Sequence, residues 1–333
     1  MFPTFFLFIN NYKNEIMKKL ITIAIVFLSF SGLKAQQDPH FTHYMFNTLE
    51  VNPAYAGSRD ALTITGLYRN QWIGFKGAPF TQTLTGHAPI LKDKLGIGLS
   101  IMNDRIGPTN STSAFADFAY RIPLGQSKKA RLAFGVKGGL NIMQIGLQEL
   151  GVRDGGDPEF YKNVSNKILP NFGFGVYYYT DNYYVGASIP RILENYYEGN
   201  VNGTETDNLA RQKRHYDFIM GAMFKLGKNV KLKPSMLIKV AEAAPPEIDL
   251  SALFYLMNDR FWIGPAFRTS FKSTDAVSAL VGVNITEQFA LGYSFDYSIL
   301  NRSFKYNGGS HELMLRYDFI YSNNPRVKSP RYF

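Results

Sequence analysis

After residue 60 the sequence alternates apolar residues with small or polar ones at a period of two, and the pattern returns along most of the remaining chain. FALGYSFDYSI (289–299) puts Phe, Leu, Tyr and Ile on one face, and Ala, Gly, Ser and Asp on the other. VKLKPSMLIKV (230–240), EIDLSALFYLM (247–257) and LGIGLSIM (95–102) repeat this arrangement. Successive side chains of a strand point to opposite faces, so each run predicts a β-strand with one apolar face and one small, polar face.

About fourteen such runs follow one another, and most have close to the ~9–11 residues that a tilted strand needs to cross a bilayer. They lie near residues 61–70, 79–90, 95–105, 111–123, 130–144, 168–180, 183–190, 214–226, 230–241, 247–257, 261–271, 275–285, 289–299 and 310–320. No long helical pattern interrupts them. The chain is therefore expected to be all-β.

The lengths of the links between these runs alternate. Every second link is tight, and the links between them include all the long ones, at 71–78, 145–167, 191–213 and 300–309. Outer-membrane barrels have short periplasmic turns and longer extracellular loops. The alternation predicts a transmembrane antiparallel outer-membrane β-barrel over residues 60–320, with a C-terminal periplasmic tail at 321–333.

The two faces of the strands favour the same architecture over a soluble β-sandwich. A sandwich exposes its polar face to water, where Lys, Glu and Thr are common, whereas here that face carries mainly Gly, Ser, Ala and Asn, as suits a crowded or water-filled lumen. Aromatic residues flank the tight turns, and we expect them to form interfacial girdles. They are Tyr177, Tyr178, Tyr179, Tyr183, Tyr184, Phe261 and Trp262.

The N-terminal residues 1–35 have the pattern of an export signal. Met17-Lys18-Lys19 precedes the short apolar run LITIAIVFLSF (20–30), and a cut after Ala35 is predicted. Residues 1–16 then form an upstream extension. The chain carries a formal charge of +10 and no cysteine. Because an exported chain rarely meets nucleic acid, we interpret this charge as solvated surface and expect outer-membrane lipid as the environment.

Two groups of residues raise the question of a metal. His40 and His43 form an H-x-x-H pair, but no third ligand lies nearby in the sequence. Asp154, Asp157 and Glu159 share one loop, although their spacing departs from that of a Ca²⁺ loop. We interpret the histidines as solvated or packed and the carboxylates as a charged turn, and we predict no metal and no cofactor.

Catalytic patterns are absent from the sequence. His215 lies close to Asp217, yet nothing near them has the spacing of a nucleophile and its base. Gly135, Gly138 and Gly139 lie inside a predicted strand, and not at a strand-to-helix turn that would cradle a phosphate. We therefore expect that the protein is not an enzyme.

The segment QDPHFTHYMFNTLEVNPAYAGS (37–58) fits neither a strand nor a membrane helix. It resembles the opening of the PorP/SprF family of Bacteroidetes, membrane proteins of the type IX secretion system. YRNQW (68–72), NDRIGP (103–108) and SPRYF (329–333) are also similar to this family. The matching positions of the N-terminal motif include Asp38, Pro39, Tyr44, Phe46, Asn47, Asn52, Pro53, Tyr55 and Gly57.

The resemblance implies a fourteen-stranded barrel related to the long-chain fatty-acid transporter type. It also implies a role in exporting large secreted proteins, such as gliding adhesins, and in holding them at the cell surface through their C-terminal sorting domain. Some members of the family are instead components of the core machinery, and the sequence leaves both roles open. An outer-membrane channel or transporter for hydrophobic or small solutes is the alternative function.

Two hypotheses about sites follow. Residues 36–59 form either a periplasmic segment or a plug, with a turn at Pro53 and Gly57 before the first strand. The two longest outer loops mix Tyr with basic residues, the types that anchor protein interfaces. The proposed partner-binding residues are Arg153, Tyr161, Lys162, Arg191, Tyr196, Tyr197, Arg211 and Lys213.

Overall fold

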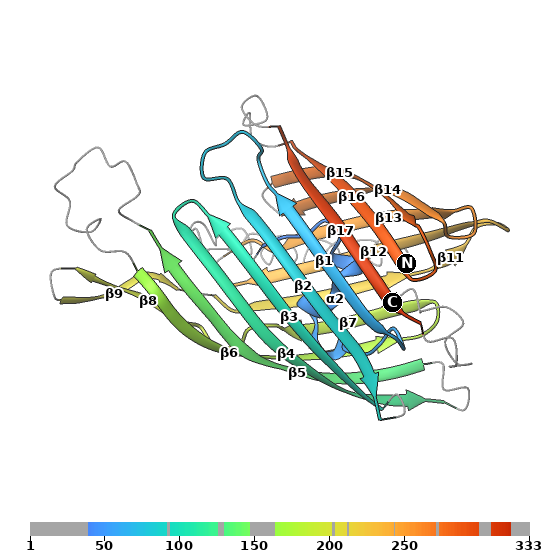
Figure 1. Cartoon of the computed structure of the whole chain (residues 1–333), viewed down its shortest axis with the longest axis horizontal. Helices are drawn as coiled ribbons and strands as arrows, with labels where there is room; N and C mark the ends of the chain where they lie inside the picture. The colour runs from blue at the N-terminus through green and yellow to red at the C-terminus, as the bar shows by residue number, and fades with distance from the viewer. Residues whose placement is uncertain are drawn as a thin grey trace, which may run out of the picture.

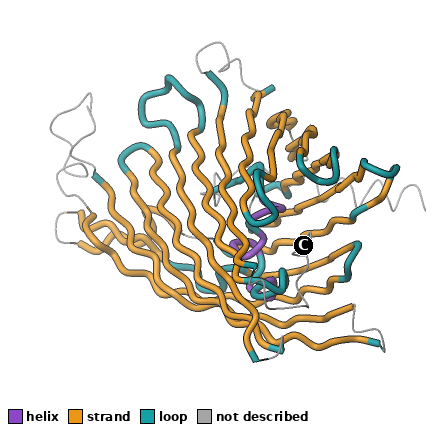
Figure 2. Tube along the Cα trace, turned by 45° about the vertical axis from the view of Figure 1, so that its right-hand side comes forward, coloured by secondary structure: helices purple, strands orange, loops and turns teal. Residues whose placement is uncertain are grey.

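The computed structural model describes residues 39–91, 94–125, 130–146, 164–201, 204–211, 213–242, 244–270, 273–299 and 308–320. Within these ranges the chain forms one closed antiparallel barrel of fourteen strands (Figures 1 and 2). The described residues include no helix that is long and apolar enough to span a membrane. The predicted all-β barrel and its strand number are confirmed. The predicted signal peptide and the C-terminal tail lie outside the described residues.

Each barrel strand pairs with the next one along the chain, and β1 pairs with β17 to close the barrel. β10 pairs with both β7 and β12, and the two-residue β11 (Phe224–Lys225) continues beside β12. The barrel strands are β1 (Leu62–Asn70), β2 (Phe80–Ile90), β3 (Leu95–Ile106), β4 (Thr109–Leu124), β5 (Ala130–Ile145), β6 (Val164–Tyr179), β7 (Tyr183–Ile189), β10 (His215–Ala222), β12 (Val230–Ala241), β13 (Glu247–Leu256), β14 (Phe261–Ser270), β15 (Ser273–Asn284), β16 (Phe289–Ser298) and β17 (Ser310–Phe319).

The predicted strands agree with these bounds to within a few residues, but one hairpin was not predicted. Residues 191–213 were expected to be a loop, whereas β8 (Tyr196–Val201) and β9 (Thr204–Arg211) pair there as a separate two-stranded sheet. YYEGNV and TETDNLAR lack a clear apolar face, so the period-two pattern gives no signal. The Asn-Gly dipeptide between them in the sequence is the local hairpin signal that was available.

The outer wall of the barrel is apolar and its inner wall is small and polar, as the alternation predicts. On β16, for example, Ala290, Ser294 and Asp296 are buried while Tyr293 and Tyr297 are exposed on the other face. The predicted girdle is wrong for part of its members, because adjacent residues of a strand cannot face the same side. Tyr183 and Phe261 are exposed and Tyr178 is half-buried, whereas Tyr177, Tyr179, Tyr184 and Trp262 are buried inside.

Inside the barrel lies a compact segment, residues 39–59, which we call the plug. It contains η1 (Tyr44–Phe46), α2 (Thr48–Val51) and η2 (Pro53–Tyr55). Every residue from 41 to 59 is buried except Glu50. The hydrophobic core of the protein is formed between the plug and the inner wall. The structure thus places the N-terminal motif in the lumen, one of the two locations considered from the sequence.

Local chemistry explains the shape of the plug. The side chain of Asn52 accepts a hydrogen bond from the backbone N–H of Ala54 (2.9 Å) and caps η2, and Pro53 occupies the first position of that turn. Gly57 has a φ of +74°, which L-residues rarely adopt, and its Cα lies against the wall at β3. These residues bend the chain back towards the start of β1.

The inner face of the wall is poor in side chains where the plug passes. A Cβ at Gly96 would meet the backbone of Ala56, and a Cβ at Gly135 would meet the backbone of Ala54. Gly175 lies in the same way against the side chain of Asn52. The small residues of the predicted lumen face therefore allow the plug backbone to pack directly on the strands.

Candidate functional site

The plug runs between the two ends of the barrel. We call the end with the tight links the turn end, which faces the periplasm in outer-membrane barrels, and the opposite end the loop end. Pro39 lies at the loop end, where its carbonyl accepts a hydrogen bond from Lys239 near the end of β12 (3.4 Å). Arg59 lies at the turn end, beside the last residues of β17. The candidate site is the contact surface between this plug and the wall.

At the turn end a buried ion pair fixes the plug. Arg59 donates from Nε and Nη2 to the two carboxylate oxygens of Asp318, at 3.1 and 2.9 Å. The hydroxyl of Thr63 donates to the same carboxylate at 2.6 Å, and Arg316 lies 3.4 Å from it. A planar, two-bond pair of this kind sets both distance and direction. It connects the plug to β17 and, through Thr63, to β1.

Closer to the loop end, two carboxylates of the wall hold the first residues of the plug. Glu312 accepts hydrogen bonds from the backbone N–H groups of Thr42 (3.0 Å) and His43 (2.8 Å), and it lies 2.8 Å from His43 Nδ1. Asp296 accepts a hydrogen bond from the Thr42 hydroxyl at 2.8 Å. Arg69 bridges both carboxylates, with contacts of 2.9 Å to Glu312 and 2.6 Å to Asp296. Every member of this cluster is buried.

The middle of the plug is bound through its backbone. Lys137 on β5 donates to the carbonyls of Leu49 (3.3 Å) and Glu50 (3.4 Å), at the C-terminal end of α2, where a cation is favourable. Ser188 on β7 donates to the carbonyl of Val51 at 2.8 Å. Asn52 reaches between β6 and β7 and donates to the carbonyl of Val176 at 3.0 Å. Polar contacts thus surround the plug on several sides.

Aromatic packing fills the space next to these hydrogen bonds. The ring of Phe46 lies 4.9 Å from that of Trp262, and the ring of His43 meets Trp262 edge-on at 5.7 Å. The charged ends of Lys233 and Arg316 lie 5.3 and 5.4 Å from the centre of the Phe46 ring. Such ring and cation contacts stabilise a buried, fixed arrangement. The inward position of Trp262 is explained by this role.

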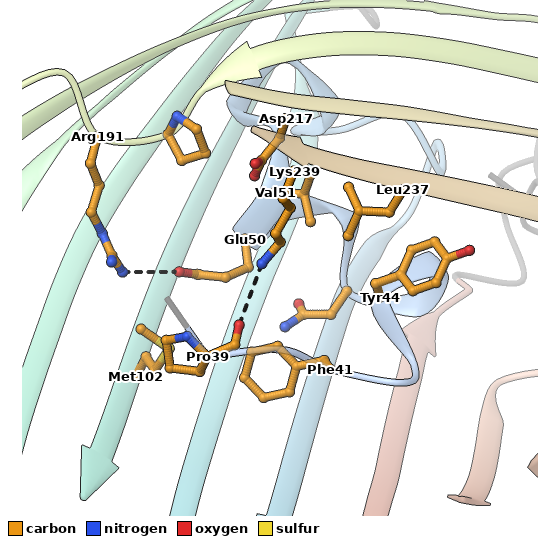
Figure 3. A pocket seen from close by; sticks show the side chains of 12 residues that line it. Pro39, Phe41, Tyr44, Glu50, Val51, Met102, Arg191, Asp217, Leu237 and Lys239 are labelled. Atoms are coloured by element: carbon orange, nitrogen blue, oxygen red, sulfur yellow. Dashed lines mark hydrogen bonds and ion pairs between the residues drawn. The ribbon is translucent and has the colours of Figure 1, made fainter. Parts of the chain in front are cut away.

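One gap between the plug and the wall lies towards the loop end. A cavity of about 40 Å³ lies between the plug and the wall, where it is lined by residues of β3, β10 and β12 and by Pro190 and Arg191 just after β7 (Figure 3). Its charged lining includes Glu50, Asp217 and Lys239, and Arg191 approaches Glu50 to 3.9 Å. A cavity of this size has room for a few water molecules.

The H-x-x-H histidines are separated by the fold. His43 binds Glu312, while His40 lies 3.1 Å from Glu247 and close to Asp249 on β13, with ligand atoms all within 4.8 Å of one another. Burial lowers the pKa of His40, and the nearby Lys239 and Arg268 lower it further, so its ring is neutral.

His40, Glu247 and Asp249 together offer the kind of ligand atoms that bind a cation. Arg268 already contacts both carboxylates, at 2.6 Å from Asp249 and 3.1 Å from Glu247. The guanidinium supplies the positive charge that a metal would bring. The arrangement therefore favours an ion-paired cluster, and the expectation of no metal remains a prediction.

The proposed partner-binding residues lie in different parts of the structure. Arg191 is only 9% exposed, and its side chain turns into the lumen towards the plug and over the Phe115 ring (5.9 Å). Its prediction as an outer-surface residue is wrong, because the chain after β7 bends inward against Gly173. Lys213 pairs with the exposed Glu242 at 3.2 Å. Tyr196 and Tyr197 lie on β8 and Arg211 on β9, while Asp38, Arg153, Tyr161 and Lys162 lie outside the described residues.

Sequence reasoning missed the wall residues that hold the plug. Arg69, Asp296, Glu312 and Asp318 all stand on the small, polar faces of their strands. Burying a charged residue on this inward face costs free energy unless the charge is paired. Charged residues at these positions therefore indicate a partner inside the barrel. The identity of the partner depends on pairs more than 240 residues apart in sequence, such as Arg69 and Glu312.

The close contact at Gly135 gives a direct test of the plug. We expect Gly135→Val to displace the plug, because the new side chain would occupy the place of the Ala54 backbone. The chain has no cysteine, so Ala56→Cys supplies a single thiol at a position that is fully buried. Its reaction with a maleimide should become about tenfold faster in the Gly135→Val background, as local opening exposes it.

Gly138→Val on the same strand is the matched control. A Cβ there meets only the Phe172 ring at an ordinary distance of 3.5 Å. Equal labelling rates with valine at either position would contradict the packing described above.

Comparisons with known proteins bear on the whole chain. A family model described as type IX secretion system membrane protein PorP/SprF matches residues 33–317. No curated protein sequence matches the chain.

Several solved outer-membrane proteins share low similarity with it. The Acinetobacter baumannii outer membrane protein Omp33 has 11% identity and a TM-score of 0.45, over 80% of this chain and 100% of its own. A Pseudomonas aeruginosa FadL homologue has 13% identity and a TM-score of 0.45, over 85% of this chain and 95% of its own.

Proposed function

The chain belongs to the PorP/SprF family of type IX secretion system membrane proteins, and from this premise we propose that it pairs with a secreted cargo protein. In this role the barrel is a membrane-anchored partner that supports export of the cargo and holds it at the cell surface. The cargo is of the adhesin type and is recognised through its C-terminal sorting domain.

The observation that carries this proposal is the filled lumen. The plug is bound to the wall through Arg59 at the turn end and through Thr42 and His43 nearer the loop end, and a cavity of about 40 Å³ remains beside it. A polypeptide could cross the barrel only after all these buried contacts were broken. A secretion component with such a lumen is better suited to bind a cargo at its rim than to conduct it.

The loop end is the side on which we place the cargo. The hairpin of β8 and β9 stands beyond the barrel wall at this end (Figure 1). Its strands carry Tyr196, Tyr197 and Arg211, the residue types that dominate interface energetics. The inward turn of Arg191 removes that residue from the proposed surface.

The test is to replace residues 196–211 by a short Gly-Ser linker and to measure cargo on intact cells by protease accessibility. We expect surface cargo to fall about tenfold, as for the loss of several interface anchors. The matched control inserts the same linker at the turn 227–229, on the opposite end, and should leave the cargo unchanged. Full surface cargo after replacement of the hairpin, with the barrel still folded and inserted, would refute the proposal.

The alternative function is a channel or transporter for hydrophobic or small solutes. An open pore of this kind would conduct ions in a planar bilayer with the intact chain. Because the hydrogen-bonded plug occupies the lumen, an open pore is not expected. The conductance of the intact chain should not exceed the leak of the bilayer. Steady conductance of the intact barrel would favour the alternative.

A further inference from the structure

The outward face of the wall contains one groove of about 320 Å³ across β17, β1, β2 and β3, strands that lie side by side in Figure 1. Its sides are formed by Leu84, Ile101, Leu313 and Leu315, all of which are exposed on the lipid-facing side. Gly66 forms part of its lining. The groove is separate from the plug and from the loop end.

The register of the strands explains the groove. Gly66 is paired with Leu315 on one side and with Leu84 on the other, and Leu84 is paired with Ile101. A row of large aliphatic side chains is therefore interrupted at Gly66. Because neighbouring strands lie ~4.8 Å apart, one missing side chain leaves a slot between Leu315 and Leu84 that is about as wide as one hydrocarbon chain.

Polar side chains begin one row closer to the loop end. Tyr68 is paired with Gln82, and Gln82 with Asn103, all three of which line the groove. Both donor contacts of the Asn103 amide go to neighbours on β4, to Asn110 and Thr112 at 2.8 Å each, which leaves its carbonyl oxygen pointing away from these two. An amide on a lipid-facing wall is tolerated at the level of the lipid ester groups, and not in the hydrocarbon.

A cation stands one further row towards the loop end. Arg105 is exposed and is paired in register with Phe80 and with Asn110. It lies four residues beyond Ile101 on β3, which corresponds to ~13 Å along the strand. Apolar slot, amide row and guanidinium thus follow one another in the order of acyl chain, ester and phosphate in a membrane lipid.

We propose that this groove is a binding site for one phosphate-bearing lipid of the outer leaflet. One acyl chain lies in the slot at Gly66, the polar linkage of the lipid meets Gln82 and Asn103, and the phosphate pairs with Arg105. The charge of Arg105 favours an anionic lipid over a neutral one, since a basic group near the membrane surface attracts anionic headgroups. A protein partner would need an apolar surface that fits the groove. It would not require apolar, amide and cationic groups to follow one another in the order found in a lipid.

The test uses the full chain, purified in mild detergent and mixed with phosphatidic acid or with diacylglycerol of the same acyl chains, which lacks the phosphate. Retained lipid is counted by native mass spectrometry. We expect phosphatidic acid to be retained at one copy per barrel. Gly66→Leu should reduce it about tenfold, because the leucine fills the slot and excludes several methylene groups.

Two further variants separate the roles. Arg105→Gln should lower retention of phosphatidic acid about fivefold and leave diacylglycerol unchanged, the effect of losing one surface cation. Ala116 lies on the outward face of β4, outside the groove. Ala116→Leu should leave the retention of both lipids unchanged. Gly66→Leu is expected to fold, since a Cβ there meets only the Thr83 carbonyl at 3.8 Å.

Three outcomes would overturn the proposal. The first is equal lipid retention by the intact chain and the Gly66→Leu variant. The second is retention that does not distinguish phosphatidic acid from diacylglycerol. The third is a purified barrel that forms dimers which Gly66→Leu dissociates, because the groove would then be a contact between copies of this chain. Loss of cargo pairing, by contrast, has no bearing on this site.

Discussion

Deletion of residues 39–59 should convert a non-conducting barrel into an ion-conducting pore. Among the strand pairings that the structure describes, none involves a plug residue, so we expect the fourteen strands and the seam between β1 and β17 to remain in the deletion variant. The exposed inner wall would be lined by charged side chains such as Lys137, Lys233, Asp117 and Asp249, which water hydrates readily. Single-channel recording in planar bilayers should show steps for the deletion variant and none for the intact chain.

The control for this experiment is the barrel that lacks the hairpin 196–211. It should stay closed, because the hairpin lies outside the lumen. A folded deletion variant that does not conduct would contradict the plug assignment, and so would an intact chain that conducts equally. The amount of cargo at the cell surface can stay the same whether or not the barrel conducts. The conductance experiment therefore tests the plug independently of the proposed function.

Glu312→Leu should destabilise the protein by about 3 kcal/mol, the typical cost of removing one partner of a buried ion cluster. Glu312 is 1% exposed, and its loss leaves Arg69 and the backbone N–H groups of Thr42 and His43 without this acceptor. Asp296 still pairs with Arg69 and limits the effect. The free energy of unfolding, measured by urea titration in lipid vesicles, checks the value.

Two comparisons sharpen this result. Arg69→Leu combined with Glu312→Leu should cost less than the sum of the single changes, because neither charge is then left alone. The exposed pair of Lys213 and Glu242 offers the matched surface case, and Glu242→Leu should cost under ~1 kcal/mol. Equal effects of Glu242→Leu and Glu312→Leu would show that the buried cluster does not hold the plug.

The strand pattern was accessible from sequence because each strand carries its own signal. Ala290, Ser294 and Asp296 face inward and Tyr293 outward on β16, as alternation alone requires. Loop lengths added the orientation of the barrel.

Contacts between distant parts of the chain were not accessible. Nothing local in HFTHYMFN indicates that Thr42 and His43 bind Glu312, about 270 residues later. The inward positions of Tyr177 and Trp262 were missed for a different reason, because the alternation of the strand was not applied to these aromatic residues. Their composition fits a membrane interface, and only the pleat and the plug decide which side they face.

The position of the plug has a consequence for the assembly of the barrel. The plug precedes all strands in the sequence, yet Arg59 binds Asp318 and Thr42 binds Asp296, at separations of 259 and 254 residues. Contacts of such high sequence separation form late, since a long loop of chain must first be closed. The polar groups of the plug therefore remain without these partners until the last strands have folded. Closing the β1–β17 seam and seating the plug are thus coupled steps of folding, and the open chain, whose plug contacts are not yet made, is the stage most exposed to aggregation.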